Sequence, residues 1–229
     1  MNKKIYIDRL FPDVNTLQLH HKLKINQESI MYITIPTDAE QITRIIKNHL
    51  AEISREGTDI VVCDATAGVG GNTISFAQHF GKVHAVEVDT ERFNYLTNNV
   101  NAYRFENVTL HHGDCHVVVP QIGPQDVIFV DPPWGGKGYK KREKVVLRMG
   151  DSDVEDTCLR FLTSAKILVV KLPKNYDVEH FYRRVSPETK RIYLYELNKM
   201  VIIVGIVGGV GDGVGDGAGD GAGDITPQG

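Results

Sequence analysis

Residues 60–72, Ile60-Val61-Val62-Cys63-Asp64-Ala65-Thr66-Ala67-Gly68-Val69-Gly70-Gly71-Asn72, set the architecture of this chain. The first four residues form a short apolar run bounded by turn signals, which is typical of a buried parallel strand. The glycines let the backbone approach a ligand closely, and residues 73–79 predict a helix. This segment therefore begins an α/β unit in which a strand leads through a glycine-rich loop into a helix.

The same alternation of strand and helix continues along the chain. A helix is predicted over residues 37–55, with Thr37 as N-cap and Glu40 completing a capping box. The final two apolar runs predict a hairpin. The predicted strands are residues 60–63, 82–89, 108–111, 126–130, 167–173, 191–197 and 200–207. We expect an α/β fold with a doubly wound, mostly parallel seven-stranded Rossmann-like sheet and a C-terminal antiparallel hairpin.

Length and composition set limits on the class of protein. The chain has 229 residues, enough for one full-sized core, and its net charge is −3. A nucleic-acid partner would therefore need a local basic patch. Cys63, Cys115 and Cys158 form no CxxC pair, which predicts a reduced, intracellular, soluble protein without a metal site. The sequence contains no run of 18 apolar residues, so it predicts no membrane span. We also expect a monomer.

Three regions are expected along the chain. Residues 1–36 predict an N-terminal arm that folds over the active site, and residues 37–207 predict the catalytic domain. Residues 208–229 are rich in Gly and Asp. Such a composition cannot bury a core and predicts a disordered tail.

Acidic residues follow four predicted strands: Asp64, Glu87, Asp114 and Asp131. Ligands of such sheets bind outside the carboxyl ends of the strands, so we expect these acids at one edge. Asp64 would repel a pyrophosphate but could accept hydrogen bonds from an ammonium group. Glu87 lies 19 residues after Gly68, near the spacing of a ribose-binding carboxylate. This pattern favours S-adenosylmethionine over a dinucleotide. Asp114 is placed to meet an adenine amino group, but a solvated turn is nearly as good an explanation for it.

Asp131-Pro132-Pro133-Trp134-Gly135-Gly136 follows the fourth strand and predicts a rigid lip. The prolines remove two N–H donors but keep their carbonyl acceptors. Acceptors beside the flat face of Trp134 suit a flat ring that carries an amino group, such as a nucleobase. A strand-ending turn with a core tryptophan is the alternative. The densest basic run follows, with Tyr139 among Lys137, Lys140, Lys141, Arg142 and Lys144, and predicts a phosphate-binding surface.

These motifs together resemble the class I S-adenosylmethionine-dependent methyltransferases, and more narrowly the trimethylguanosine synthase family. The resemblance covers roughly residues 9–205. Its most specific part is the pair formed by residues 68–72 (GVGGN) and 132–136 (PPWGG). Further matches are Arg9-Leu10-Phe11, Thr34-Ile35-Pro36, Asp64-Ala65, Thr73-Ile74, Tyr139 and Leu172-Pro173-Lys174-Asn175.

The resemblance implies a role for each matching residue. The methionine tail and ribose of S-adenosylmethionine would contact Asp64, Gly68, Gly70 and Glu87, and the adenine would contact Asp114. In catalysis, Asp131 and the Pro132 carbonyl would accept the hydrogens of the target amino group. Trp134 would stack on the cationic 7-methylguanine ring, a contact that gains a cation–π energy of roughly 0.5–2 kcal/mol. Phe11 would lie near the base or cofactor, and Tyr139 and Lys174 would touch the cap triphosphate.

The implied reaction is methyl transfer to the exocyclic N2 of the 7-methylguanosine cap of RNA, giving 2,7-dimethyl- and, after a second transfer, 2,2,7-trimethylguanosine. Two residues depart from the family pattern. Asp131 stands where the family usually has Ser, and Lys174 stands where it usually has Arg. Both put the substrate, not the reaction class, in question. The alternatives are an amino methyltransferase acting on an internal base of rRNA, tRNA or DNA, and a non-catalytic cap-binding module that kept the fold.

Overall fold

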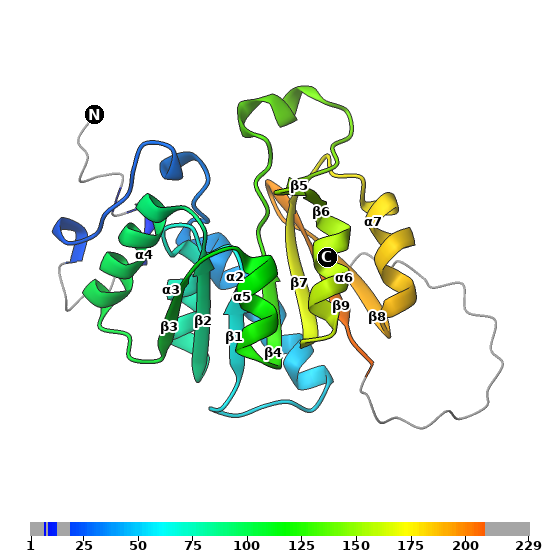
Figure 1. The fold of residues 1–229 in the computed structure, drawn as a ribbon, viewed down its shortest axis with the longest axis horizontal. Coiled ribbons are helices and arrows are strands. Elements are labelled where there is room, and N and C mark those ends of the chain that lie inside the picture. Colours follow the sequence, from blue (N-terminus) through cyan, green and yellow to red (C-terminus); the bar gives the residue numbers. More distant parts are fainter. Residues whose placement is uncertain (1–6, 8, 13–18, 209–229) are drawn as a thin grey trace. The chain divides into compact units, whose positions relative to one another are not determined.

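The structure is a computed structural model that describes residues 7, 9–12 and 19–208 (Figure 1). The chain divides into two compact units, Met1–Phe129 and Val130–Gly229, and we describe each by itself. The predicted disordered tail lies outside the described residues from residue 209 onward. Within the described part of the chain, no helix has both the length and the apolarity needed to cross a bilayer.

Seven strands form the sheet in the order β3-β2-β1-β4-β7-β9-β8. β1 pairs in parallel with β2 and β4, and β2 pairs in parallel with β3. β9 pairs antiparallel with β7 and β8. The strands are β1 Val61–Asp64, β2 Lys82–Glu87, β3 Val108–His112, β4 Gln125–Val130, β7 Ala165–Pro173, β8 Arg191–Glu196 and β9 Met200–Ile206. The predicted mostly parallel sheet with a C-terminal antiparallel hairpin is thus confirmed.

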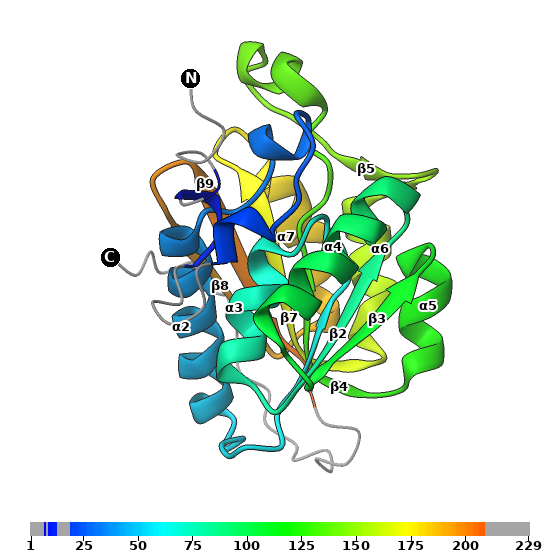
Figure 2. The same ribbon diagram turned by 90° about the vertical axis from the view of Figure 1, so that its left-hand side faces the viewer.

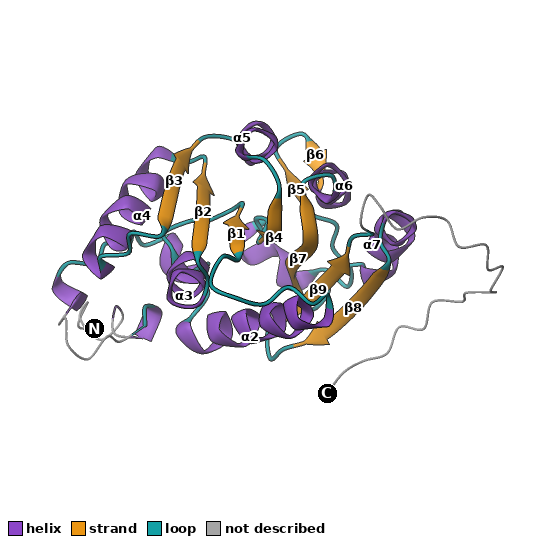
Figure 3. Cartoon of the chain, turned by 90° about the horizontal axis from the view of Figure 1, so that it is seen from below, coloured by secondary structure: helices purple, strands orange, loops and turns teal. Residues whose placement is uncertain are grey.

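In the first unit, α2 (Pro36–Glu52), α3 (Gly71–His79), α4 (Thr90–Tyr103) and α5 (Cys115–Ile122) surround the parallel strands. α2 packs on α3, and α3 and α5 cover opposite faces of β1 and β2 (Figure 3). Both faces of β2 are therefore buried, and Val83, Ala85 and Val86 are all inaccessible to solvent. A strand covered on both faces does not alternate between apolar and polar residues, and Val83, Ala85 and Val86 follow this rule.

The capping box predicted for α2 is wrong. The helix begins at Pro36 with Ile35 as N-cap, and no side chain caps it. Proline is favoured at the first helical position because its fixed φ suits a helix and its missing N–H would be unbonded there. Glu40 instead lies with Oε2 at 2.9 Å from Nε2 of His79 on α3, so it joins two helices.

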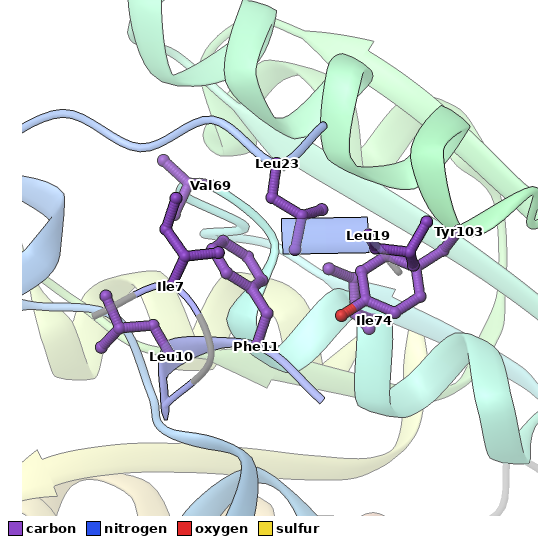
Figure 4. Close-up of a cluster of buried hydrophobic side chains, with 8 residues drawn as sticks. All are labelled: Ile7, Leu10, Phe11, Leu19, Leu23, Val69, Ile74 and Tyr103. Atoms are coloured by element: carbon purple, nitrogen blue, oxygen red, sulfur yellow. The ribbon is translucent and has the colours of Figure 1, made fainter. Parts of the chain in front are cut away.

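The described part of the N-terminal segment packs against the first unit (Figure 2). It contains two short turns of 3₁₀-helix, Leu19–His21 and Ser29–Met31. Its apolar side chains meet the residue that follows Gly68 and residues of α3 and α4 in what we call the N-terminal cluster (Figure 4). The members are Ile7, Leu10, Phe11, Leu19, Leu23, Val69, Ile74 and Tyr103. This part of the segment belongs to the core of the first unit, and its predicted place over the active site stays a prediction.

In the second unit, a 3₁₀ turn over Gly136–Lys141 (η3) precedes a small hairpin of β5 (Arg148–Met149) and β6 (Ser152–Asp153). α6 (Val154–Leu162) packs on β7 and on α7 (Val178–Val185), and Ser186–Glu188 forms a last 3₁₀ turn. The sequence predicts this helix over residues 151–162, but the structure begins it three residues later, at Val154. The structure uses these residues to close the hairpin before Asp153 becomes the N-cap.

Candidate active site

Three of the four predicted acids lie at one edge of the first unit. Asp64 ends β1 and Glu87 ends β2, which pair in parallel, so both residues reach the carboxyl edge of the sheet. Asp114 follows the next parallel strand, whose residue His112 is in register with Glu87. Asp64 and Glu87 are buried, whereas Asp114 is exposed. The topology therefore brings these acids together as parallel pairing predicts.

Glu87 fastens the glycine-rich loop to the strand edge. One carboxylate oxygen accepts a hydrogen bond from the Gly68 N–H at 2.9 Å. The other accepts from the Asp89 N–H at 2.8 Å and from Nε of Arg92 at 3.2 Å. Arg92 received no role in the sequence analysis, since an arginine in the first turns of a helix is ordinarily solvated. The loop is thus held in place by the same carboxylate that the family resemblance assigns to the ribose.

The loop has the backbone and the chemistry that fit an adenosyl amino acid. Gly68 and Gly70 adopt left-handed φ angles of 56° and 103°, which suit glycine. A Cβ built on Gly68 would meet nothing within 4 Å, so space adjoins the loop there. Asp64 accepts a hydrogen bond from Thr73 Oγ1 at 2.6 Å and sits beside the start of α3, which no side chain caps. Such a site can receive an ammonium at the acid and a carboxylate at the helix N-terminus, whereas the acids would repel a phosphate.

Asn99 on α4 is a structural residue of this site that the sequence did not reveal. Its side chain is fully buried and accepts from the Lys24 N–H at 2.8 Å. The amide nitrogen donates to the Lys24 and Val69 carbonyls, both at 2.9 Å. The two partner segments lie 75 and 30 residues away in sequence. Asn99 therefore ties the N-terminal segment, the glycine-rich loop and α4 together.

Asp114 serves as the N-cap of α5. Its carboxylate accepts from the His116 N–H at 2.9 Å and pairs with the His116 ring at 3.0 Å. Ligand atoms of Asp114, Cys115 and His116 lie within 4.8 Å of one another. Burial raises the pKa of the Cys115 thiol to about 12, so the thiol stays protonated at neutral pH. The adenine contact of Asp114 remains a prediction.

In the second unit, Asp131 forms a buried ion pair with a residue that received no role in the sequence analysis. Nζ of Lys171, on β7, lies 2.6 Å from Oδ2 of Asp131. The Lys171 side chain is 4% exposed and that of Asp131 is 16% exposed. Burial raises the pKa of Asp131, while the Lys171 ammonium and the Trp134 indole act in the opposite direction. A lone lysine in the predicted strand 167–173 was the signal, because a buried lysine is almost always paired.

Trp134 stands beside this pair and lines a cavity. Lys171 Nζ lies 5.1 Å from the centre of the Trp134 ring, and Tyr139 meets the ring edge-on, with centroids 5.4 Å apart. The cavity has a volume of about 250 Å³ and is also lined by Pro133, Arg142 and Arg148. The predicted residues Trp134 and Tyr139 are therefore brought together in an aromatic corner with basic side chains at hand.

Asn175 holds the loop that carries Tyr139. Its amide nitrogen donates to the main-chain carbonyls of Tyr139 and Arg142, at 2.9 and 2.8 Å. The preceding residue, Lys174, is exposed. Phe11, by contrast, is 2% exposed within the N-terminal cluster. Its surroundings account for it as a core residue, and its contact with a base stays a prediction.

Comparisons with known proteins show the family of this chain. A family model described as RNA cap guanine-N2 methyltransferase matches residues 59–207. An uncharacterized protein of Acanthamoeba polyphaga mimivirus is 34% identical over 85% of this chain and 83% of its own length. The trimethylguanosine synthase of Saccharomyces cerevisiae is 26% identical over 53% of this chain and 41% of its own length. The chain therefore spans most of the viral relative but less than half of the yeast synthase.

Among solved structures, the 16S rRNA N2 methyltransferase RsmC of T. thermophilus, in complex with AdoMet and guanosine, is similar in fold. The TM-score is 0.55 at 15% identity, over 80% of this chain and 43% of that one. An rRNA methylase of Streptococcus thermophilus gives a TM-score of 0.52 at 16% identity, over 76% of this chain and 98% of that one. These likenesses confirm the predicted methyltransferase fold.

Proposed function

This chain belongs to the RNA cap guanine-N2 methyltransferase family, and from that premise we propose that it methylates the exocyclic N2 of a 7-methylguanosine cap. The family makes it an S-adenosylmethionine-dependent methyltransferase. The proposed product is 2,7-dimethylguanosine, and a second transfer would give 2,2,7-trimethylguanosine.

One observation carries the proposal: the cavity of about 250 Å³ beside Trp134, with Arg142 and Arg148 in its lining. The cavity joins an aromatic face to cationic side chains. A 7-methylated guanine is a flat cation, which gains stacking and cation–π energy on an indole ring. The cap phosphates require positive charge near that ring, which the two arginines of the lining can supply, and we propose that the exposed Lys174 adds to it.

We propose that the residues of each unit have separate tasks. In the first unit, Asp64 would receive the ammonium of the methionine tail and Glu87 the ribose hydroxyls, with Gly68 and Gly70 allowing close approach. S-adenosylmethionine supplies the electrophilic methyl group. In the second unit, Asp131 and the Pro132 carbonyl would accept the two hydrogens of the target amino group.

The reason for such acceptors lies in the nitrogen itself. The lone pair of an exocyclic amino group is conjugated into the ring, so the group is a weak nucleophile. Hydrogen bonds from both N–H groups to Asp131 and Pro132 would localise that lone pair and direct it at the methyl group. Positioning of this kind supplies several kcal/mol without a covalent intermediate. The proton lost after methyl transfer would pass to Asp131 or to solvent.

Asp131 also favours a second candidate function. Asp-Pro-Pro-aromatic is the pattern of methyltransferases that act on adenine or cytosine amino groups, so an internal base of rRNA, tRNA or DNA is the alternative substrate. A non-catalytic cap-binding module is the least supported candidate, since the glycines and acids expected to bind the cofactor are all present.

The test is methyl transfer from labelled S-adenosylmethionine to 7-methyl-GDP, with GDP, uncapped RNA and single-stranded DNA in parallel. We expect transfer to 7-methyl-GDP alone, and the mass of the product will count the methyl groups. Transfer only to RNA or DNA would move the assignment to an internal base. Cofactor binding without transfer to any acceptor would refute the enzymatic proposal for the isolated chain.

A further inference from the structure

Lys171 is a buried cation within the apolar part of β7, residues 167–173. It lies in the middle of Ile167–Pro173, whose other members are all 1% exposed or less apart from Pro173. Lys171 as a whole residue is 3% exposed. A lysine costs several kcal/mol to bury unless a counter-charge is close. Here the counter-charge is Asp131, at 2.6 Å.

The pair also contacts the proposed base-stacking ring. Lys171 Nζ lies 5.1 Å from the centroid of Trp134, so one ammonium group touches both the acceptor carboxylate and the indole. Tyr139 packs on the edge of the same indole, and burial raises its pKa, so it stays neutral around pH 7. The ammonium that pairs with the Asp131 carboxylate therefore comes from β7.

We propose that Lys171 is a positioning residue, which keeps the Asp131 carboxylate ionised and fixed beside Trp134. The inference rests on the proposed role of Asp131 as acceptor of the target amino group. Asp131 is mostly buried, and burial alone favours the protonated acid. A protonated acid would accept the amino hydrogens poorly. The ammonium of Lys171 opposes this effect of burial.

The first experiment is the pH dependence of kcat/KM for the wild-type chain, Lys171→Met and the charge-preserving Lys171→Arg. In Lys171→Met, the acid limb should move at least one unit to higher pH, because Asp131 has lost its counter-charge. Each pH unit below the new midpoint lowers the ionised fraction about tenfold. Lys171→Arg should leave the limb in place. A merely structural role would lower kcat at every pH without moving the limb.

A second readout requires no substrate, because Trp134 is the single tryptophan of the chain. Its fluorescence should change as Asp131 titrates, and the midpoint should move to higher pH in Lys171→Met. The double variant Lys171→Met/Asp131→Asn should show no such transition. An unmoved midpoint, together with an unmoved acid limb, would overturn the role of Lys171. Absence of methyl transfer by the wild-type chain would refute the proposed function instead, and the fluorescence titration would still decide the inference.

Folding of Lys171→Met is itself informative. Its Asp131 would have a higher pKa in the folded than in the unfolded chain. The resulting stabilisation is present at low pH and is lost as the pH rises through the folded-state pKa. In urea unfolding, Lys171→Met should therefore gain stability on acidification relative to the double variant. Parallel pH dependence of the two variants would contradict the proposal, even if Lys171→Met is partly unfolded at pH 7.

Discussion

Asn99→Asp is the substitution that most directly tests how the glycine-rich loop is built. The new side chain has the same shape, but the amide nitrogen that donates to the Lys24 and Val69 carbonyls becomes an oxygen. Each lost hydrogen bond costs about 1 kcal/mol net, and leaving the buried Val69 carbonyl without a donor costs roughly 1–3 kcal/mol. We expect a loss of about 2–5 kcal/mol in the free energy of unfolding, out of the roughly 5–15 kcal/mol typical of a domain.

The matched control is Asn94→Asp, on the same helix. Asn94 is exposed, so this variant adds the same charge without touching the loop and should stay within about 0.5 kcal/mol of the wild-type chain. Urea unfolding followed by circular dichroism measures both variants. The stability of Asn99→Asp should partly return as the pH falls, because the protonated carboxyl group regains one donor.

The same substitution should weaken cofactor binding, since Val69 lies between Gly68 and Gly70. Every 1.4 kcal/mol that binding must spend on restoring the loop lowers the affinity about tenfold. Isothermal titration with S-adenosylmethionine measures this loss. If Asn99→Asp and Asn94→Asp differ by less than about 1 kcal/mol in stability and bind the cofactor equally, the view that Asn99 holds the loop is refuted.

Three further predictions concern other parts of the molecule. Trp134→Ala should weaken binding of 7-methyl-GDP at least tenfold and Trp134→Phe less, measured by calorimetry, with unchanged circular dichroism; equal affinity in all three chains would exclude stacking on this ring. Burial lowers the pKa of His84, which lies 2.9 Å from His111, to about 4. Stability should therefore be intact above pH 6.5 and fall as the pH drops toward 4, and His84→Gln should flatten a plot of urea midpoint against pH. Gly71→Ala should lower the melting temperature, because its Cβ would lie 2.8 Å from main-chain and side-chain atoms, whereas Gly138→Ala meets nothing within 4 Å and should not.

Local patterns predicted most of the fold. Strands such as Val108–His112 were predicted to within a residue of their observed bounds, because hydrophobic periodicity is a short-range property. The acids Asp64 and Glu87 were found for the same reason, since a residue at the end of a parallel strand needs no further information to be placed at the sheet edge.

The interactions that hold the site together were not predictable in this way. Asp131 and Lys171 lie 40 residues apart in sequence, and Asn99 lies 75 residues from Lys24, whose carbonyl it contacts. No local pattern states which buried polar groups will meet across such separations. Glu155 is another example, because its fully buried carboxylate accepts from the hydroxyl of Tyr176, 21 residues away. The lone charge of Lys171 inside the predicted apolar strand 167–173 indicated that a counter-charge must be near, but the sequence did not identify it as Asp131.

If the glycine-rich loop binds the cofactor as proposed, the N-terminal cluster would link the beginning of the chain to cofactor affinity. Phe11 and Leu23 belong to the same apolar cluster as Val69 of the glycine-rich loop. A ligand that stabilises this loop therefore also stabilises the segment packed on it, and linkage requires the reverse to hold equally. Resistance of the segment to proteolysis and affinity for S-adenosylmethionine thus become two measures of one free energy. In a shortened chain that lacks these residues, the affinity for the cofactor should fall while the β-sheet is still folded.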